Sequence, residues 1–271
     1  MKSYIKFLSI AGVCGILSFM GTAIKNDEIL LNDIIISTAF GNVEYMPYFF
    51  TNFFVAYIPL TFFHFFYGTY IYRHFCTASV YYFSRKCNRT GWFLKEVGSL
   101  YIFAVLYVII YLGSEILCCV IFSSVQADIS SLYLILYYIV LYSLFLLVVT
   151  LAINLSSILF TSNIGLMLVE VVVMLCVGAY LMLGQKYITD DSLIGKYTWM
   201  IKANPFSHLI MNLHSSSIEK INKAINVKNI DFDLNISCVV YLSLGIITIL
   251  AGCIIVNKHN FIVSNQETGG V

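Results

Sequence analysis

The fold is decided by residues 129–169, whose sequence is ISSLYLILYYIVLYSLFLLVVTLAINLSSILFTSNIGLMLV and contains no charged residue. A helix that crosses the apolar part of a bilayer needs about 20 predominantly apolar residues. The stretch is therefore too long for one span. The polar residues Thr161, Ser162 and Asn163 are where it can be divided. We predict one membrane-spanning helix over 131–160 and the next over 164–185.

The composition of the whole chain points the same way. Of its 271 residues, 60% are hydrophobic and only 11% are charged. A soluble domain usually has about 25% charged residues, so this chain has too few charges to cover a surface facing water. The net charge of +1 gives no field that would attract nucleic acid. Composition thus predicts an integral membrane protein with the lipid bilayer as its partner, and no nucleic-acid partner.

Four further apolar runs complete a set of six spans. The six predicted helices cover 7–24, 47–72, 97–122, 131–160, 164–185 and 236–256. Pro59 interrupts the second helix, where it removes one backbone hydrogen bond. We predict an all-α fold that forms a single transmembrane domain over residues 1–271.

The positions of lysine and arginine predict the orientation in the membrane. Basic residues concentrate in the loop 73–96, while the short loops before and after it have few. Cytoplasmic loops carry the excess of basic residues, so we place this loop in the cytoplasm. Both termini then lie on the cytoplasmic side of a plasma membrane. The long segment 186–235 lies outside, and its mixed polarity favours short helices at the membrane surface.

The cytoplasmic loop carries basic residues between aromatic ones. Arg85, Lys86 and Arg89 follow three aromatic residues and precede Trp92 and Phe93. Aromatic residues and arginine are enriched at protein interfaces, which favours a short docking helix for a cytoplasmic partner. The same pattern is typical of a basic membrane anchor with tryptophan at the lipid headgroups. Both interpretations remain open at this point.

Two glutamates lie inside predicted spans. Glu115 lies in the outer part of the third span, and Glu170 lies about two turns into the fifth. An ionisable group in hydrocarbon is costly and usually faces a cavity or a partner helix. Each glutamate could contact a substrate or an ion, or it could be protonated and hydrogen-bond between helices or at a subunit interface. We favour the protonated, hydrogen-bonded state for both.

No catalytic motif is present in the sequence. It has no Gly-x-Ser-x-Gly, no His-Glu-x-x-His and no phosphate-binding glycine loop. His208 and Asn212 have the spacing of one element of CAAX-type intramembrane proteases, but the paired glutamates of those enzymes are missing. We therefore predict no catalytic residue, no metal ligand and no cofactor bound by this chain. Ala11 and Gly15 form a small-xxx-small pair that would allow close helix packing.

The layout as a whole resembles that of ABC-2-type permeases, the membrane subunits of ATP-driven exporters. More narrowly, it resembles the small bacterial permeases that protect cells against antimicrobial peptides and lantibiotics. In the sequence, the resemblance rests on Tyr-Phe-Ser-Arg-Lys at 82–86 with Arg89, Trp92 and Phe93 after it. It also rests on Asn-Pro-Phe at 204–206 before the last span.

This resemblance implies a coupling helix that docks on an ATPase. Its residues would be Ser84, Arg85, Lys86, Arg89 and Trp92. The chain has no Walker motif, so ATP and Mg²⁺ would bind a separate ATPase polypeptide. The chain itself would not be an enzyme.

The resemblance also implies a second permease chain, identical or homologous, in a bacterial plasma membrane. A substrate path would lie between the two chains, with Glu115 and Glu170 as candidate contacts and an extracellular gate at Asn204, Pro205 and Phe206. The expected function is export of an amphipathic peptide or other hydrophobic compound out of the cell or the membrane. The alternatives are a membrane sensor or assembly subunit, and a channel.

Overall fold

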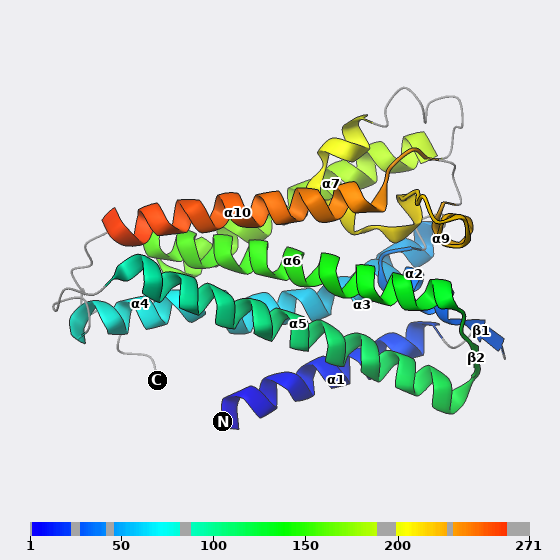
Figure 1. Ribbon diagram of the computed structural model, residues 1–271, viewed down its shortest axis with the longest axis horizontal. Helices are drawn as coiled ribbons and strands as arrows, with labels where there is room; N and C mark the ends of the chain where they lie inside the picture. Colours follow the sequence, from blue (N-terminus) through cyan, green and yellow to red (C-terminus); the bar gives the residue numbers. More distant parts are fainter. Residues whose placement is uncertain are drawn as a thin grey trace.

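The computed structural model describes residues 2–22, 28–41, 46–81, 88–188, 199–226 and 230–258. Almost all of them are helical, which confirms the predicted all-α class apart from two short strands. The long helices run side by side along the molecule (Figure 1). They are α1 (Lys2–Thr22), α3 (Met46–Tyr67), α5 (Arg89–Phe122), α6 (Ile129–Leu159), α7 (Ser162–Ile188) and α10 (Leu234–Lys258), and α4 (Tyr70–Tyr81) follows directly after α3.

Five stretches of the described chain are helical, long and apolar enough to cross a membrane. They are Phe53–Thr77, Arg89–Phe122, Ile129–Leu159, Ser162–Met182 and Leu234–Lys258. In α1, the apolar part whose side chains are described, Leu8–Met20, is shorter than a span. Five of the six predicted spans thus have a matching helix, and the first span remains a prediction.

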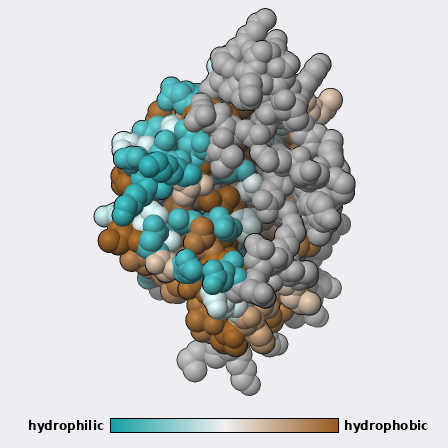
Figure 2. Space-filling model, turned by 90° about the vertical axis from the view of Figure 1, so that its right-hand side faces the viewer, coloured by the Kyte–Doolittle hydropathy of each residue, from teal (hydrophilic) through white to brown (hydrophobic). Residues whose placement is uncertain are grey.

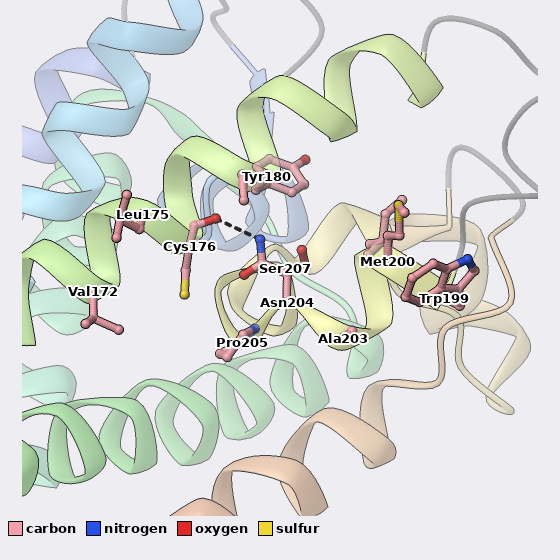
Figure 3. A pocket seen from close by; sticks show the side chains of 12 residues that line it. Val172, Leu175, Cys176, Tyr180, Trp199, Met200, Ala203, Asn204, Pro205 and Ser207 are labelled. Atoms are coloured by element: carbon pink, nitrogen blue, oxygen red, sulfur yellow. Dashed lines mark hydrogen bonds between the residues drawn. The ribbon is translucent and has the colours of Figure 1, made fainter.

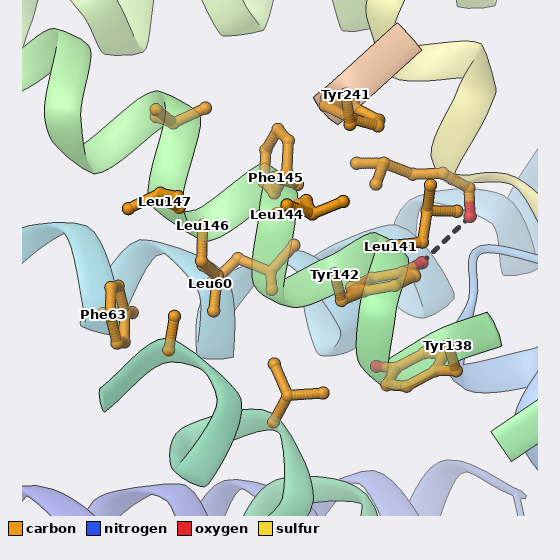
Figure 4. Close-up of a cluster of buried hydrophobic side chains, with 14 of the residues drawn as sticks. Leu60, Phe63, Tyr138, Leu141, Tyr142, Leu144, Phe145, Leu146, Leu147 and Tyr241 are labelled. Carbon is orange, nitrogen blue, oxygen red and sulfur yellow. Dashed lines mark hydrogen bonds between the residues drawn. The ribbon is translucent and has the colours of Figure 1, made fainter. Parts of the chain in front are cut away.

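Helix α6 lies at the centre of the bundle. It packs against α3, α5, α7 and α10, and Figure 4 shows its buried side chains among those of its neighbours. The Tyr142 hydroxyl donates a hydrogen bond to the Leu209 carbonyl oxygen over 3.1 Å. Lipid is as apolar as the helix side chains, so helices in a bilayer associate through close packing and bonds of this kind. The centre of the bundle has close packing and such a hydrogen bond.

The charge-free stretch divides close to the predicted place. Helix α6 ends at Leu159 and α7 begins at Ser162. In the first turn of α7, a Cβ atom on Gly165 would lie 2.5 Å from the backbone nitrogen of Ser157. Because only glycine permits such a close approach, the chain can reverse direction over a two-residue connection.

The second predicted span contains a break that the sequence does not reveal. Helix α3 continues through Pro59, ends at Tyr67, and is followed by a new helix from Tyr70. A break at membrane depth leaves backbone groups that need partners inside the protein. Asn154 of α6 supplies them: its Nδ2 donates to the Tyr67 carbonyl oxygen over 2.9 Å, and its Oδ1 accepts from the Tyr72 N–H over 3.0 Å.

The described parts of the predicted cytoplasmic loop are almost entirely helical. Helix α4 extends to Tyr81, and α5 begins at Arg89. Asn88 caps α5, because its side chain accepts a hydrogen bond from the Gly91 N–H over 3.0 Å. The 34 residues of α5 make a helix about 51 Å long, whereas the hydrocarbon core is about 30 Å thick. A helix of this length reaches beyond the hydrocarbon core of a bilayer that it crosses, and residues 82–88 connect it to α4.

Helix α1 packs closely on α5. Ala11 is fully buried, and a Cβ atom on Gly15 would lie 2.3 Å from the Tyr111 carbonyl oxygen. Both members of the predicted small-xxx-small pair thus lie on the packed face of α1, and Gly15 lets the two backbones approach.

We expect Gly15→Ala to displace α1 and to destabilise the protein by about 1–3 kcal/mol, because the obstructing atom belongs to the backbone and cannot move aside. Gly12→Ala is the matched control, since its Cβ would meet only the Ile110 side chain, at 4.0 Å. This control should cost nothing, because alanine is the better helix former. Thermal unfolding in detergent measures both variants, and equal losses would contradict the prediction.

Short elements cover the end of the bundle that lies opposite the first turn of α5 (Figure 1). We call β1, α2, β2 and residues 199–226 and 230–233 the end cap. Its members are β1 (Glu28–Leu30), α2 (Leu31–Thr38), β2 (Ser124–Gln126), a helical segment at 199–203, η1 (Pro205–Leu209), η2 (Met211–Leu213) and α9 (Glu219–Ile225). The two strands pair in parallel. Figure 2 looks onto this end, where hydrophilic residues gather.

The end cap agrees in part with the sequence analysis. Short helices do occur in the predicted outer segment 186–235. The strand pair and α2 were not predicted, because each strand has only three residues and the two strands lie far apart in the sequence. Pairing over such a distance depends on the bundle bringing the two loops together.

Candidate functional site

Three of the five residues predicted to dock an ATPase, Ser84, Arg85 and Lys86, lie outside the described residues. The other two, Arg89 and Trp92, lie in the first turn of α5. These two residues show how the 82–88 connection joins the bundle.

The first turn of α5 is attached to two other helices. Arg89 Nη1 donates a hydrogen bond to the Val256 carbonyl oxygen, at the C-terminal end of α10, over 3.4 Å. The Trp92 ring packs on the Phe75 ring of α4, with 6.0 Å between the ring centroids. The 82–88 connection is therefore followed by a turn in contact with both α4 and α10.

Contact between α5 and α10 continues next to this turn. The Asn257 Nδ2 donates a hydrogen bond to the Thr90 hydroxyl over 2.8 Å. Phe93 is fully buried, and a Cβ atom on Gly252 would lie 2.3 Å from its ring atom Cζ. Because the two helices are packed this closely, a movement of the first turn of α5 would also move α10.

Glu115 is fully buried on the side of α5 that faces α2. Its Oε2 lies 3.0 Å from the Thr38 hydroxyl, which also lies 2.7 Å from the Ile34 carbonyl oxygen. A carbonyl only accepts, and Thr38 has one hydroxyl hydrogen. Both contacts are hydrogen bonds only if Glu115 is protonated and donates to Thr38. The geometry agrees with a neutral glutamate that bonds between helices.

Glu170 of α7 is the centre of a second polar cluster. Its Oε1 lies 2.7 Å from His64 Nδ1, and its Oε2 accepts a hydrogen bond from the Tyr57 hydroxyl over 2.9 Å. The His64 ring is fully buried, and its Nε2 has no hydrogen-bond partner in the described part of the chain. The Glu170 side chain is 19% exposed, so it lies at the edge of the bundle. Glu115 and Glu170 belong to separate clusters and do not contact one another.

The residues predicted at an extracellular gate attach the end cap to two spans. Asn204 Nδ2 donates to the Cys176 carbonyl oxygen of α7 over 2.7 Å (Figure 3). The Tyr241 hydroxyl of α10 donates to the Pro205 carbonyl oxygen over 2.8 Å. Phe206 is also buried. The three residues thus lie where a movement of α7 or α10 would reach the end cap.

Sequence analysis missed a buried pair of histidines in the end cap. The Ser237 hydroxyl, in the first turn of α10, lies 2.8 Å from His208 Nδ1 and 2.7 Å from His214 Nε2. The other nitrogen of each ring donates to a carbonyl, from His208 to Lys202 over 2.9 Å and from His214 to Ile210 over 2.8 Å. Burial lowers the pKa of both histidines, that of His214 to about 4.

The spacing of His208 and Asn212 does not correspond to a site. His208 faces Ser237, whereas the Asn212 side chain donates to the Gly41 carbonyl oxygen. Because Ser237 is itself fully buried, a substrate has no route to its hydroxyl. The sequence carries no signal for the contact of these two histidines with Ser237, since only the fold brings the three residues together.

In the ranges that the structure describes, no three His, Cys, Asp or Glu side chains are grouped around one point. These ranges therefore contain no candidate set of metal ligands. Comparison of the chain with protein-family models, with curated proteins and with solved structures gives no match. The function must therefore be inferred from the residues and their packing.

Proposed function

We propose that this chain is the permease subunit of an ATP-driven exporter of the ABC-2 type, with α1 as the sixth span and the 82–88 connection in the cytoplasm. One observation carries the proposal. The basic and aromatic connection leads into a turn that Arg89 bonds to α10 and Trp92 packs on α4. A protein docked on the connection would therefore act on α4, α5 and α10 together.

In this proposal a separate ATPase, holding ATP and Mg²⁺, docks through Ser84, Arg85 and Lys86. Closure of the ATPase moves the first turn of α5, and α4 and α10 follow because they are in contact with it. The bundle then changes between two packings, which is how alternating access works. Asn204, Pro205 and Phe206 would carry the movement of α7 and α10 to the end cap, which serves as the outer gate.

A second permease chain, identical or homologous, would complete the transporter. Apolar residues on α7 and α10 are exposed along most of both helices, which suits a lipid or protein neighbour. An amphipathic peptide or other hydrophobic compound would pass between the two chains, out of the cell or the membrane. Glu170 lies at the edge of the bundle and is the better placed substrate contact. Glu115 is fully buried, so it would reach a substrate only in the other packing.

Pull-down of the full-length protein from native membranes in mild detergent tests the proposal. We expect an ATPase to co-purify with the wild-type chain and to be lost from the variant Arg85→Ala with Lys86→Ala, with ATP hydrolysis as the readout. Trp92 is left unchanged, because its ring packs on Phe75 and its removal would disturb the bundle.

The matched control is Lys220→Ala with Lys223→Ala. It removes two exposed basic residues from α9, at the opposite end of the bundle, and changes the net charge by the same amount. This variant should retain the ATPase. If no ATPase accompanies intact wild-type protein, or if both variants lose it equally, the exporter proposal fails. A sensor or assembly subunit, or a channel, would then be the better interpretation.

A further inference from the structure

The polar cluster around Glu170 joins α7 to α3 at membrane depth. Glu170 lies about 12 Å along α7 from Ser162, within a hydrocarbon core that is about 30 Å thick. Its Oε1 lies 2.7 Å from His64 Nδ1, and its Oε2 accepts a hydrogen bond from the Tyr57 hydroxyl over 2.9 Å. Both oxygens of the carboxyl group are thus held by α3. Ionisable groups at this depth are rare and mark functional sites.

The cluster is accessible through Glu170. Its two partners on α3 are buried, whereas the Glu170 side chain is 19% exposed. Met167 and Met174, about one turn away on either side, are 68% and 42% exposed. Helix α7 is one of the five helices suited to cross a membrane. A molecule that reaches Glu170 between these side chains therefore comes from the bilayer.

The cluster has a place for one exchangeable proton. In the described part of the chain, the titratable groups that face Glu170 are His64 and Tyr57. The contact between Glu170 and His64 contains one hydrogen, whichever of the two atoms carries it, and the cluster then has a net charge of −1. A further proton on His64 Nε2 makes the cluster neutral. Because a net charge in hydrocarbon is costly, the empty cluster holds this proton.

Release of that proton prepares the cluster to bind another cation. A carboxylate has about four lone-pair sites, of which His64 and Tyr57 use two. A positively charged group can therefore bind on the exposed side of Glu170, where it restores a net charge of zero. Because such a cation arrives through the bilayer, it must have a hydrophobic body.

We propose that Glu170, held by His64 and Tyr57, binds the positive group of a lipophilic organic cation in exchange for one proton, which passes to the surrounding water. Binding needs only that α3 and α7 lie in a bilayer, and it does not involve an ATPase. That the bound cation is also the exported compound rests on the proposed function.

Calorimetric titration of the purified full-length protein in a non-ionic detergent tests the site. The probe is methyltriphenylphosphonium, and triphenylphosphine oxide is its control, because it has the same three phenyl rings and no net charge. After subtraction of binding to empty micelles, we expect the protein to bind the cation at least about tenfold more tightly than the neutral compound. Equal affinity for the two probes would overturn the proposal.

The same titration counts the displaced protons when it is repeated in buffers with different ionisation enthalpies. We expect release of about one proton per bound cation, and an affinity that rises with pH by up to about tenfold per pH unit. Binding of the cation without proton release at any pH between about 5 and 8 would contradict the exchange. This measurement uses the wild-type protein, so it tests the proposal even if a variant does not fold.

Glu170→Gln identifies the group that binds the cation. The amide keeps the size of the side chain and can hydrogen-bond to both partners on α3, but it carries no charge. We expect the cation to bind at least about tenfold more weakly and without pH dependence, while triphenylphosphine oxide binds as before.

Glu219→Gln is the matched control, because it removes the charge of an exposed glutamate on α9, in the end cap. It should leave binding of the cation unchanged. If Glu170→Gln binds the cation as tightly as the wild type, or if both variants lose the same affinity, Glu170 is not the site. Either failure would leave co-purification of an ATPase with the intact chain untouched, so the two proposals are judged separately.

Discussion

Replacing Glu170 by alanine is expected to destabilise the protein by about 1–3 kcal/mol, because the change leaves the fully buried His64 ring without its partner. Without Glu170, His64 Nδ1 loses its contact at 2.7 Å, and the Tyr57 hydroxyl loses its acceptor. The imidazole would then be buried with neither nitrogen bonded, since its Nε2 has no partner among the described residues to begin with. Thermal unfolding in detergent micelles measures the loss.

A double variant identifies the cause of this loss. His64→Leu, combined with Glu170→Ala, removes the orphaned ring and should recover a large part of the stability, because it is the unpaired polar group that is costly. Val171→Ala, one residue along α7 on an exposed position, should cost almost nothing. If Glu170→Ala is no worse than Val171→Ala, or if the two changes in the double variant simply add, the cluster does not hold α3 and α7 together.

The long helices could be predicted because a bilayer imposes both a length and an apolar surface on each span. The predicted range 236–256 matches helix Leu234–Lys258, and 131–160 matches Ile129–Leu159. The break after Tyr67 could not be predicted. It depends on Asn154, which lies in another helix and more than 80 residues further along the chain.

The same limit applies to the candidate sites. Glu115 and Glu170 could be singled out because a charged residue is conspicuous within an apolar run. Their partners Thr38, Tyr57 and His64 come from other helices, so only the fold reveals them. His64 itself lies in a predicted span and was a signal that could have been used. The docking residues at 84–86 stay a prediction, since they lie outside the described residues.

Ser237 has one hydroxyl hydrogen for two histidine nitrogens. The carbonyls of Lys202 and Ile210 only accept, so each ring carries its hydrogen on the side facing its carbonyl. In the neutral rings, the nitrogens of His208 and His214 that face Ser237 both lack a hydrogen. One added proton completes the network, because a charged ring donates to Ser237 and Ser237 donates to the other ring. A second added proton would put a hydrogen on both histidine nitrogens that face Ser237, and the hydrogen bond that Ser237 donates would be lost.

Burial nevertheless opposes the charge that the first added proton brings, so acidification from pH 7 to pH 4 is expected to destabilise the end cap. His214 titrates near 6.5 when the chain is unfolded, but burial and the charge on His208 lower its pKa to about 4 in the fold. In this interval the unfolded chain binds more protons, so stability falls as the pH falls. The full pKa difference corresponds to about 3 kcal/mol. Thermal unfolding in detergent micelles at each pH measures the loss.

Two variants separate this effect from general acid denaturation. His214→Leu removes the titrating ring, keeps an apolar side chain beside Phe232 and leaves Ser237 its bond to His208. Most of the acid-induced loss should disappear. His74→Leu, on α4 at the other end of the bundle, removes a half-exposed histidine and should leave the loss unchanged.

The two variants are needed because protonation of Asp128 is a second source of acid sensitivity at this end of the protein. Hydrogen bonds from Ser130 and Ser131 hold the pKa of its carboxyl below the usual range, so protonation of Asp128 also weakens this end of the protein as the pH falls. Its effect has the same sign as that of the histidine pair, but it begins at a lower pH, near and below 4. A loss that starts below pH 6.5 and is absent from His214→Leu belongs to the histidine pair. A loss that persists in His214→Leu and starts only near pH 4 belongs to Asp128, and the histidine pair would then be ruled out as the acid-sensitive group.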